Sequence, residues 1–190
     1  MVTYNRLNRI REHPLGGVAL FMAITLVFHL LWRLGRPVFE EGALFLSLAD
    51  FTTERVYLAA AWVNERIMGE AIQRMDAICT FQIAGEAAGQ PFTGRLIVDH
   101  SCSGLKQFYQ ALVLFLLYPG QWKHKLWYIP LAIFVMHIIN ILRIIVLSLT
   151  MQHAYQHWDL VHDWVVRPLF YVVLFALWVM WDKHFSSSTI

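Results

Sequence analysis

The chain has 190 residues, of which 58% are hydrophobic, and its mean hydropathy is +0.50. Soluble domains contain about 45–50% apolar residues, so this composition argues against an ordinary soluble domain. The net charge is only +2, so charge gives no support to a nucleic-acid partner.

Four apolar segments have about the length that a transmembrane helix needs, which is ~20 residues for a hydrocarbon core of ~30 Å. They cover residues 16–34, 103–119, 126–150 and 164–182. The second segment is the shortest, and its polar start near Lys106 has to lie at the interface. Pro119-Gly120 ends it, and Pro130 falls in the first turns of the third segment, where proline costs least. We therefore expect residues 1–190 to form a single integral membrane domain.

A fifth apolar stretch, residues 43–63, carries charged side chains near its middle. These are Asp50, Glu54 and Arg55. On an insertion scale each such charge costs ~2.5–3.5 kcal/mol at the centre of a membrane helix. We therefore expect a helix that lies on the membrane surface or packs against the bundle, and not a lone span.

The segment between the first two spans, residues 35–102, is expected to form a small external cap. Residues 81–84 and 95–98 have the composition of strands and lie near glycine-rich turns. The predicted fold class is therefore an all-α polytopic membrane protein. It has about four transmembrane helices and a small cap with an interfacial helix and short strands.

Positive charge near the ends of the spans predicts the orientation of the chain in the membrane. The basic residues are Arg6, Arg9, Arg11, Lys123, Lys125 and Lys183. An even number of spans places all of them on the cytoplasmic side of the inner (cytoplasmic) membrane, together with both termini. Cys102 and His162 then begin spans two and four at the outer face. Arg143 lies about seven residues before the end of span three, roughly 10 Å below that face.

These three residue types suit thiol chemistry on a carbonyl group. A cysteine must become a thiolate to attack, and Cys102 is expected to open a helix, whose N-terminus favours negative charge. Gly104 would allow close approach of a substrate backbone. His162 can take the thiol proton and return it to a leaving amine. The guanidinium of Arg143 stays charged and can hold an oxyanion or the substrate carbonyl.

Each residue also has a plain structural explanation. A membrane cysteine is usually a small buried apolar side chain, and an arginine near a span end usually extends to the interface. Arg143, however, lies in the apolar run 138–149 with only Asn140 for polar company, and ionisable residues at such depth are functional by default. Because all three residues are predicted to lie at one face of the membrane, we favour a shared functional role over a separate structural role for each.

The ordered motifs Cys102-Ser103-Gly104, Asn140-Ile-Leu-Arg143 and His162 resemble those of the exosortase/archaeosortase family. The resemblance implies a membrane cysteine transpeptidase or protease that acts through a thioester. Its substrates would be exported proteins with a C-terminal sorting signal, made of a short motif, a transmembrane helix and a basic tail. Cys102 would be the nucleophile, Arg143 the transition-state stabiliser and His162 the general acid and base. No cofactor is implied. Many relatives have a glycine shortly after the histidine, and this chain has none.

Residues around the motifs have weaker assignments. Ser103, Gly104 and Asn140 are expected to bind or orient the substrate or Arg143, although helix–helix hydrogen bonding is an equal explanation for Asn140. His100 is either an alternative base or a residue that only lines the pocket. Asp163 directly follows His162. On a helix the two side chains diverge by about 100°, so we favour a surface aspartate near a helix start; the alternative is that Asp163 orients the histidine through a loop.

The remaining histidines and the second cysteine suggest other sites only weakly. His153, His157 and His162 could bind a metal, but no carboxylate or cysteine completes the set by spacing, so we expect no metal site. His29 and His137 lie inside spans, where hydrogen bonds in the bundle are favoured over haem ligation. Cys79 is interpreted as structural.

Two other functions stay open beside the enzyme. One is a non-enzymatic assembly or scaffold subunit of the membrane, in which the three residues only pack and pair. The other is a redox or haem-binding membrane protein that uses Cys79 and Cys102 or the histidines within the spans.

Overall fold

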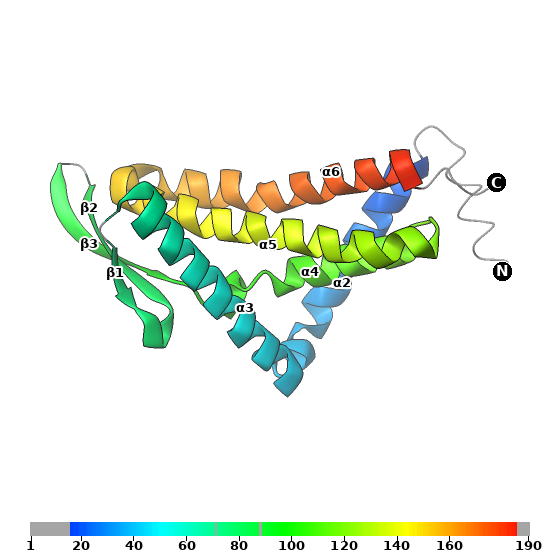
Figure 1. Ribbon diagram of the computed structural model, residues 1–190, viewed down its shortest axis with the longest axis horizontal. Helices are drawn as coiled ribbons and strands as arrows, with labels where there is room; N and C mark the ends of the chain where they lie inside the picture. The colour runs from blue at the N-terminus through cyan, green and yellow to red at the C-terminus, as the bar shows by residue number, and fades with distance from the viewer. Residues whose placement is uncertain (1–15, 71, 88, 186–190) are drawn as a thin grey trace. The chain divides into compact units, whose positions relative to one another are not determined.

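The computed structural model describes residues 16–70, 72–87 and 89–185, and these are mainly helical (Figure 1). The α-helices are α2 (Gly16–Glu40), α3 (Ala43–Trp62), α4 (Leu105–Leu117), α5 (Trp122–His153) and α6 (Arg167–Phe185). The strands are β1 (Ile72–Met75), β2 (Thr80–Ala87) and β3 (Gln90–Ile97). Short π-helical segments are η1 (Val63–Met68) and η5 (Leu160–Val166). Single 3₁₀ turns are η2 (Asp76–Ile78), η3 (His100–Cys102) and η4 (Tyr155–His157).

Three helical segments in the described part of the chain are long and apolar enough to cross a membrane. They are Gly16–Pro37, Trp122–His153 and Leu160–Phe185. They contain the predicted spans 16–34, 126–150 and 164–182, so the prediction of an all-α polytopic membrane protein is confirmed. The basic residues Arg6, Arg9 and Arg11, on which the predicted orientation partly rests, lie outside the described residues.

The predicted span 103–119 corresponds to α4, which has only 13 residues. Gly104, with φ +81°, precedes it, and Pro119-Gly120 follows it. A helix of this length rises about 20 Å, which is less than the ~30 Å core of a bilayer. That α4 with its flanking residues crosses the membrane therefore stays a prediction.

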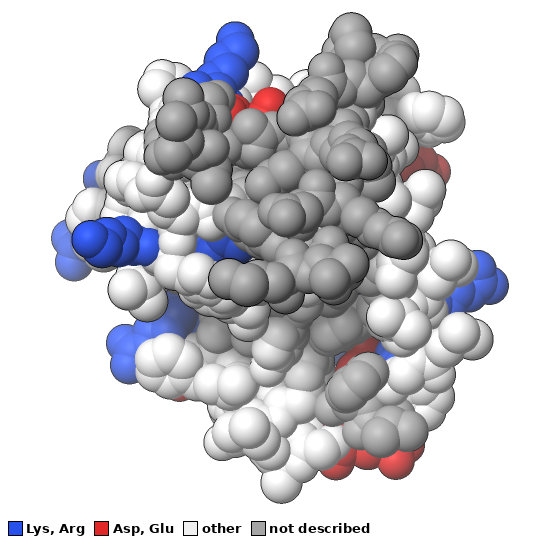
Figure 2. Space-filling model, turned by 90° about the vertical axis from the view of Figure 1, so that its right-hand side faces the viewer, with Lys and Arg blue, Asp and Glu red and all other residues white. Residues whose placement is uncertain are grey.

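Many side chains on the candidate spans are large, apolar and exposed. On α2 these include Val18, Met22, Leu26, Val27, Leu30, Leu31 and Leu34. Figure 2 shows that most of the visible surface outside the grey residues is uncharged, with Lys and Arg at separate positions. An apolar surface of this extent is what contact with lipid requires.

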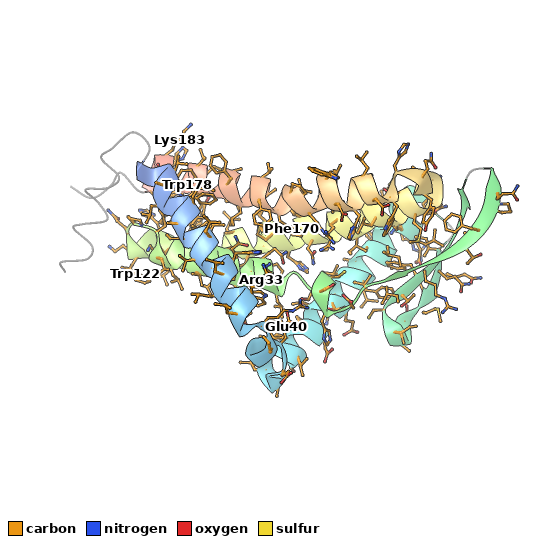
Figure 3. The ribbon with its side chains drawn as sticks, turned by 180° about the vertical axis from the view of Figure 1, so that it is seen from behind. Arg33, Glu40, Trp122, Phe170, Trp178 and Lys183 are labelled. Carbon is orange, nitrogen blue, oxygen red and sulfur yellow. The ribbon has the colours of Figure 1, made fainter. Side chains whose placement is uncertain are left out.

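The chain divides into two compact units, and one of them is built almost wholly from helices. It comprises Met1–Glu41, Lys106–Val135 and Val172–Ile190. Aromatic rings fill its interior: Phe21 of α2 lies 4.9 Å from Trp178 of α6, which Figure 3 labels beside α2. The indole of Trp181 donates to the carbonyl of Pro119 at 3.0 Å. A Cβ at Gly120 would lie 2.5 Å from the Trp181 ring, so only glycine fits there.

The other unit, called the cap unit here, comprises Gly42–Leu105 and Met136–Tyr171. Its sheet has the antiparallel order β1-β2-β3, and Phe81 of β2 pairs with Leu96 of β3 (Figure 1). The strands predicted at 81–84 and 95–98 are thus found, whereas β1 was not predicted. One apolar core joins α3, the sheet and the second half of α5. Its members include Val56, Tyr57, Phe81, Ile83, Leu96, Val98, Ile144, Leu147, Met151 and Val166.

Helix α3 packs one face against this core, and among the described residues it is not one of the helices long and apolar enough to cross a membrane. Small side chains at Ala49, Ala60 and Ala61 let it approach closely, and all three are buried. The ring of Tyr57 stacks on Phe81 at 4.6 Å. The α3 stretch is therefore a packed helix of the cap unit.

Two glycines let the β2–β3 hairpin approach the end of α5. A Cβ at Gly85 would lie 2.8 Å from the carbonyl oxygen of Met151, and one at Gly94 would lie 2.9 Å from the Met151 sulfur. Both distances are shorter than real Cβ contacts, so side chains there would push the hairpin away.

Tyr57 links the core to the polar edge of the sheet. It is 1% exposed, and its hydroxyl donates to Asp76 at 2.8 Å. Burial, and then the hydrogen bond to Asp76, raise the pKa of Tyr57 to about 12. The hydrogen bonds from Tyr57 and Arg74 lower the pKa of the Asp76 carboxyl.

We predict that Tyr57 makes the folded state sensitive to alkali. The neutral phenol is favoured in the fold, so its contribution is complete below the ordinary tyrosine pKa of about 10 and is lost as pH rises through about 12. The difference in phenolate absorbance between wild type and Tyr57→Phe isolates this titration. Asp76→Asn is expected to lower the Tyr57 pKa without bringing it to the ordinary value. A Tyr57 titration near 10 in wild type contradicts the prediction.

Candidate functional site

The candidate nucleophile lies in a single 3₁₀ turn that precedes α4. The carboxylate of Asp99 accepts hydrogen bonds from the Ser101 amide at 2.9 Å and from the Ser101 hydroxyl at 2.6 Å. The Cys102 amide then donates to the carbonyl of Asp99 at 2.9 Å. An aspartate side chain that accepts hydrogen bonds from the residue two positions later stabilises a turn. Residues 99–102 therefore fold as a turn and do not extend α4.

The prediction that Cys102 opens a helix is wrong in one respect, since α4 begins three residues later at Leu105. Gly104 has φ +81°, a left-handed conformation that ends the turn before the helix starts. The buried hydroxyl of Ser103 accepts from the Leu105 amide at 3.3 Å. The turn and α4 are therefore separate elements joined by Ser103-Gly104.

The thiol of Cys102 is half-buried against the apolar core and is not in a disulfide. Its sulfur lies 3.9 Å from the Ser101 hydroxyl. Burial alone would raise the pKa of Asp99, but hydrogen bonds from Ser101 and Cys102 outweigh it and lower that pKa. The turn thus holds an ionised carboxylate next to the motif cysteine.

The second cysteine is in a different environment. Cys79 follows η2 with φ +44°. Burial raises the pKa of the Cys79 thiol, and the carboxylates of Glu54, Asp76 and Asp50 raise it further. A thiol with a raised pKa is a poor nucleophile at neutral pH, in keeping with the structural assignment of Cys79.

Helix α3 holds the cysteine turn from one side. Asp50 Oδ1 lies 2.6 Å from His100 Nε2, and the hydroxyl of Thr53 donates to the carbonyl of Asp99 at 3.4 Å. From the sequence, Asp50 is expected only as one of the charges that argue against a membrane span. Its partner is fifty residues away, so only its place in an apolar stretch could have indicated a polar contact.

Helix α5 holds the turn through Asn140. Asn140 is fully buried, and its Nδ2 donates to the Cys102 carbonyl at 2.7 Å. Its Oδ1 is buried and has no hydrogen-bond partner among the described residues. The Asn-x-x-Arg motif is thus bonded directly to the Cys-Ser-Gly motif.

Arg143 lies one helical turn beyond Asn140 on the same helix. Its guanidinium is 5.9 Å from the ring centroid of Phe170, which Figure 3 labels on α6. Its Nε is buried and unpartnered in the described part of the chain. A buried donor without an acceptor costs about 1–3 kcal/mol, so Arg143 keeps hydrogen-bonding capacity that the protein itself does not use.

His162 lies in the π-helical segment η5, and its side chain is 26% exposed. Its Nδ1 is 2.8 Å from Asp163 Oδ1, and its ring is parallel to that of Trp158 within 8° at 5.7 Å. The interpretation of Asp163 as a surface residue was incomplete. Asp163 is exposed, but its side chain bends back to bond the histidine beside it and also pairs with Arg167 at 3.0 Å.

All six predicted site residues belong to the cap unit: Cys102, Ser103, Gly104, Asn140, Arg143 and His162. Cys102 and Asn140 are joined directly. Ile144, Val161 and Val166, which lie beside or near Arg143 and His162 in the chain, pack in the core that Cys102 contacts. No hydrogen bond joins Arg143 or His162 to Cys102 within the described ranges. The structure thus joins Cys102 to Asn140, and Arg143 and His162 lie in the same unit.

Two of the other histidines, His153 and His137, have interaction partners of their own. His153 Nε2 lies 2.9 Å from Glu70 Oε1, and the second oxygen of Glu70 accepts from Gln152 at 2.6 Å. His137 also has an interaction partner. In the part of the chain that the structure describes, no group of three or more His, Cys, Asp or Glu residues is placed to hold a metal ion.

Fold and site together define a class: a multi-pass membrane protein whose cysteine turn is bonded to a helix that carries a buried asparagine and, one turn later, an arginine with a buried Nε. A comparison with protein families matches residues 66–179 to the transmembrane exosortases. The match covers more than half of the chain, so the chain belongs to the transmembrane exosortase family, which confirms the resemblance. Comparisons with curated proteins and with solved structures gave no match.

We predict that Asn140 controls the exposure of the Cys102 thiol. Asn140→Leu leaves the Cys102 carbonyl without its donor, which costs about 1–3 kcal/mol and loosens the turn. Maleimide should therefore alkylate Cys102 several times faster, measured in a Cys79→Ser background. Ser148→Ala is the control, since Ser148 is also buried on α5 but bonds Asn64. It should lower the melting temperature without changing alkylation, whereas an unchanged rate in Asn140→Leu contradicts the prediction.

Proposed function

We propose that this exosortase family member is a cysteine transpeptidase or protease that cleaves C-terminal sorting signals of exported proteins. The observation that carries the proposal is the 2.7 Å hydrogen bond from Asn140 to the Cys102 carbonyl. It joins the two motifs, so that the thiol lies next to a helix whose arginine has an unused buried donor.

In the proposed first step, the Cys102 thiol transfers its proton to His162 and the sulfur attacks the scissile carbonyl carbon. A C–S bond forms, and the carbonyl oxygen becomes an oxyanion that the guanidinium of Arg143 stabilises. His162 then returns the proton to the leaving amine as the C–N bond breaks. The product of this step is a thioester on Cys102.

In the second step, an acceptor amine or water attacks the thioester carbonyl. The C–S bond breaks, the attacking group loses a proton through His162, and the thiol of Cys102 is restored. Asn140 Oδ1 is a buried acceptor without a partner, which suits it to receive a substrate amide N–H.

The proposed substrate is tethered by its own transmembrane helix, so it would reach the site sideways from the lipid. The positive residues in the short loops support an active site at the outer face and cytoplasmic termini. The apolar exposed surface of the candidate spans supports lateral access from lipid.

Processing in cells tests the proposal. The protein is co-expressed with exported proteins that end in an apolar helix and a basic tail, and tail removal is followed by gel shift. Cys102→Ala should abolish removal while its amount in the membrane stays normal, and Cys79→Ser should retain it. A hydroxylamine-sensitive adduct on wild type would reveal the thioester. Equal removal by wild type and Cys102→Ala overturns Cys102 as the nucleophile.

The other two roles predict graded losses. Arg143→Lys keeps a charge but not the planar donor set, and removal of one oxyanion donor costs about 10²–10³-fold in rate. His162→Gln should cost about 10²–10⁴-fold, the usual contribution of proton transfer. Rates within twofold of wild type in either variant, at equal abundance, contradict the assigned role.

A further inference from the structure

We propose that Asp163 is a positioning residue for His162, an inference about the mechanism that rests on the proposed function. The carboxylate of Asp163 fixes the imidazole in the tautomer with its proton on Nδ1. Nε2 is then the atom that exchanges the proton with the Cys102 thiol and the leaving amine.

The first argument is the polarity of the hydrogen bond. His162 Nδ1 lies 2.8 Å from Asp163 Oδ1, and an ionised carboxylate can only accept. Nδ1 must therefore be the donor, which leaves Nε2 of the neutral ring as an acceptor. A general base needs such an acceptor nitrogen.

The second argument is that the ring is held in two independent ways. Stacking on Trp158, parallel within 8°, fixes the plane of the imidazole. The bond to Asp163 fixes its rotation within that plane. A ring that is fixed in both respects places Nε2 in one position, and pre-positioning of a reacting group lowers the barrier of its reaction.

The third argument is that Asp163 is itself anchored. Arg167, one turn later, places NH1 3.0 Å from the same oxygen Oδ1. Asp163 and Arg167 are exposed, at 46% and 62% of their side-chain areas, so this ion pair adds little stability. Its effect is to limit the rotamers of Asp163, which keeps the carboxylate beside His162.

The test has two readouts on the full chain in detergent or isolated membranes. The first is the tautomer of His162, obtained from ¹⁵N-histidine NMR at alkaline pH, where an ordinary imidazole is neutral. His162→Gln assigns the signal among the nine histidines. The second is the rate of tail removal from a processed substrate. Thermal midpoint and membrane abundance show that each variant is folded.

Wild type should show His162 with its proton on Nδ1. Asp163→Asn can donate as well as accept, so it should give a mixture of tautomers and slow processing about tenfold or more, part of the usual contribution of proton transfer. Asp163→Glu should retain more activity than Asp163→Asn. The matched control, Asp159→Asn, changes an exposed aspartate one turn earlier and should stay within twofold of wild type.

A proton on Nε2 in wild type overturns the proposal, as does Asp163→Asn with both tautomer and rate unchanged. A slow rate with an unchanged tautomer also overturns it, because Asp163 would then act by another route. The tautomer does not depend on catalysis. If Cys102→Ala processes substrates as wild type does, the proposed function fails while the NMR result still decides the role of Asp163.

Discussion

The hydrogen bond from the buried amide of Asn140 to the carbonyl of Cys102 is the constraint on which the site depends. A buried amide has to find partners, because an unmade hydrogen bond in the interior costs far more than a made one contributes. Here the partner is the backbone carbonyl of Cys102, so the bond fixes the position of the turn without occupying the thiol. Asn140 therefore holds the turn in place, and its Oδ1 remains an acceptor without a partner among the described residues.

Other elements of the cap unit also hold this turn. Helix α3 binds the same turn through Asp50 and Thr53, and the strand β3 leads directly into it. The two helices and the sheet share one apolar core, which holds the polar contacts in place. Asp50, one of the three charged residues that make α3 a poor membrane span, is the residue that binds His100.

Much of the fold could be predicted because bilayer thickness leaves a strong signal in the sequence. Long apolar runs at 16–34, 126–150 and 164–182 appear as helices, and the strands at 81–84 and 95–98 pair as β2 and β3. The site residues came from the order of three motifs, and the structure places all of them in one unit. The role of each in catalysis remains a proposal.

The contacts of the two histidines could not be settled from the sequence, and the physical reasons differ. His100 bonds Asp50, a residue fifty positions away that local patterns cannot connect to it. His162 bonds its direct neighbour Asp163, which was only the less favoured alternative because successive side chains of an ideal helix diverge by about 100°. The actual backbone there is π-helical, and no residue pattern announces such a turn.

Because that turn is π-helical, the position of His162 depends on the number of residues in η5 as well as on which residues they are. A π turn closes its hydrogen bond over five residues where an α turn uses four, so η5 holds one more residue than a regular helix would. Deleting one residue between Asp159 and His162 would let the segment relax to α geometry and turn the histidine by about 100° around the axis. Insertions and deletions in this stretch should therefore disturb the site more than most substitutions of its exposed side chains.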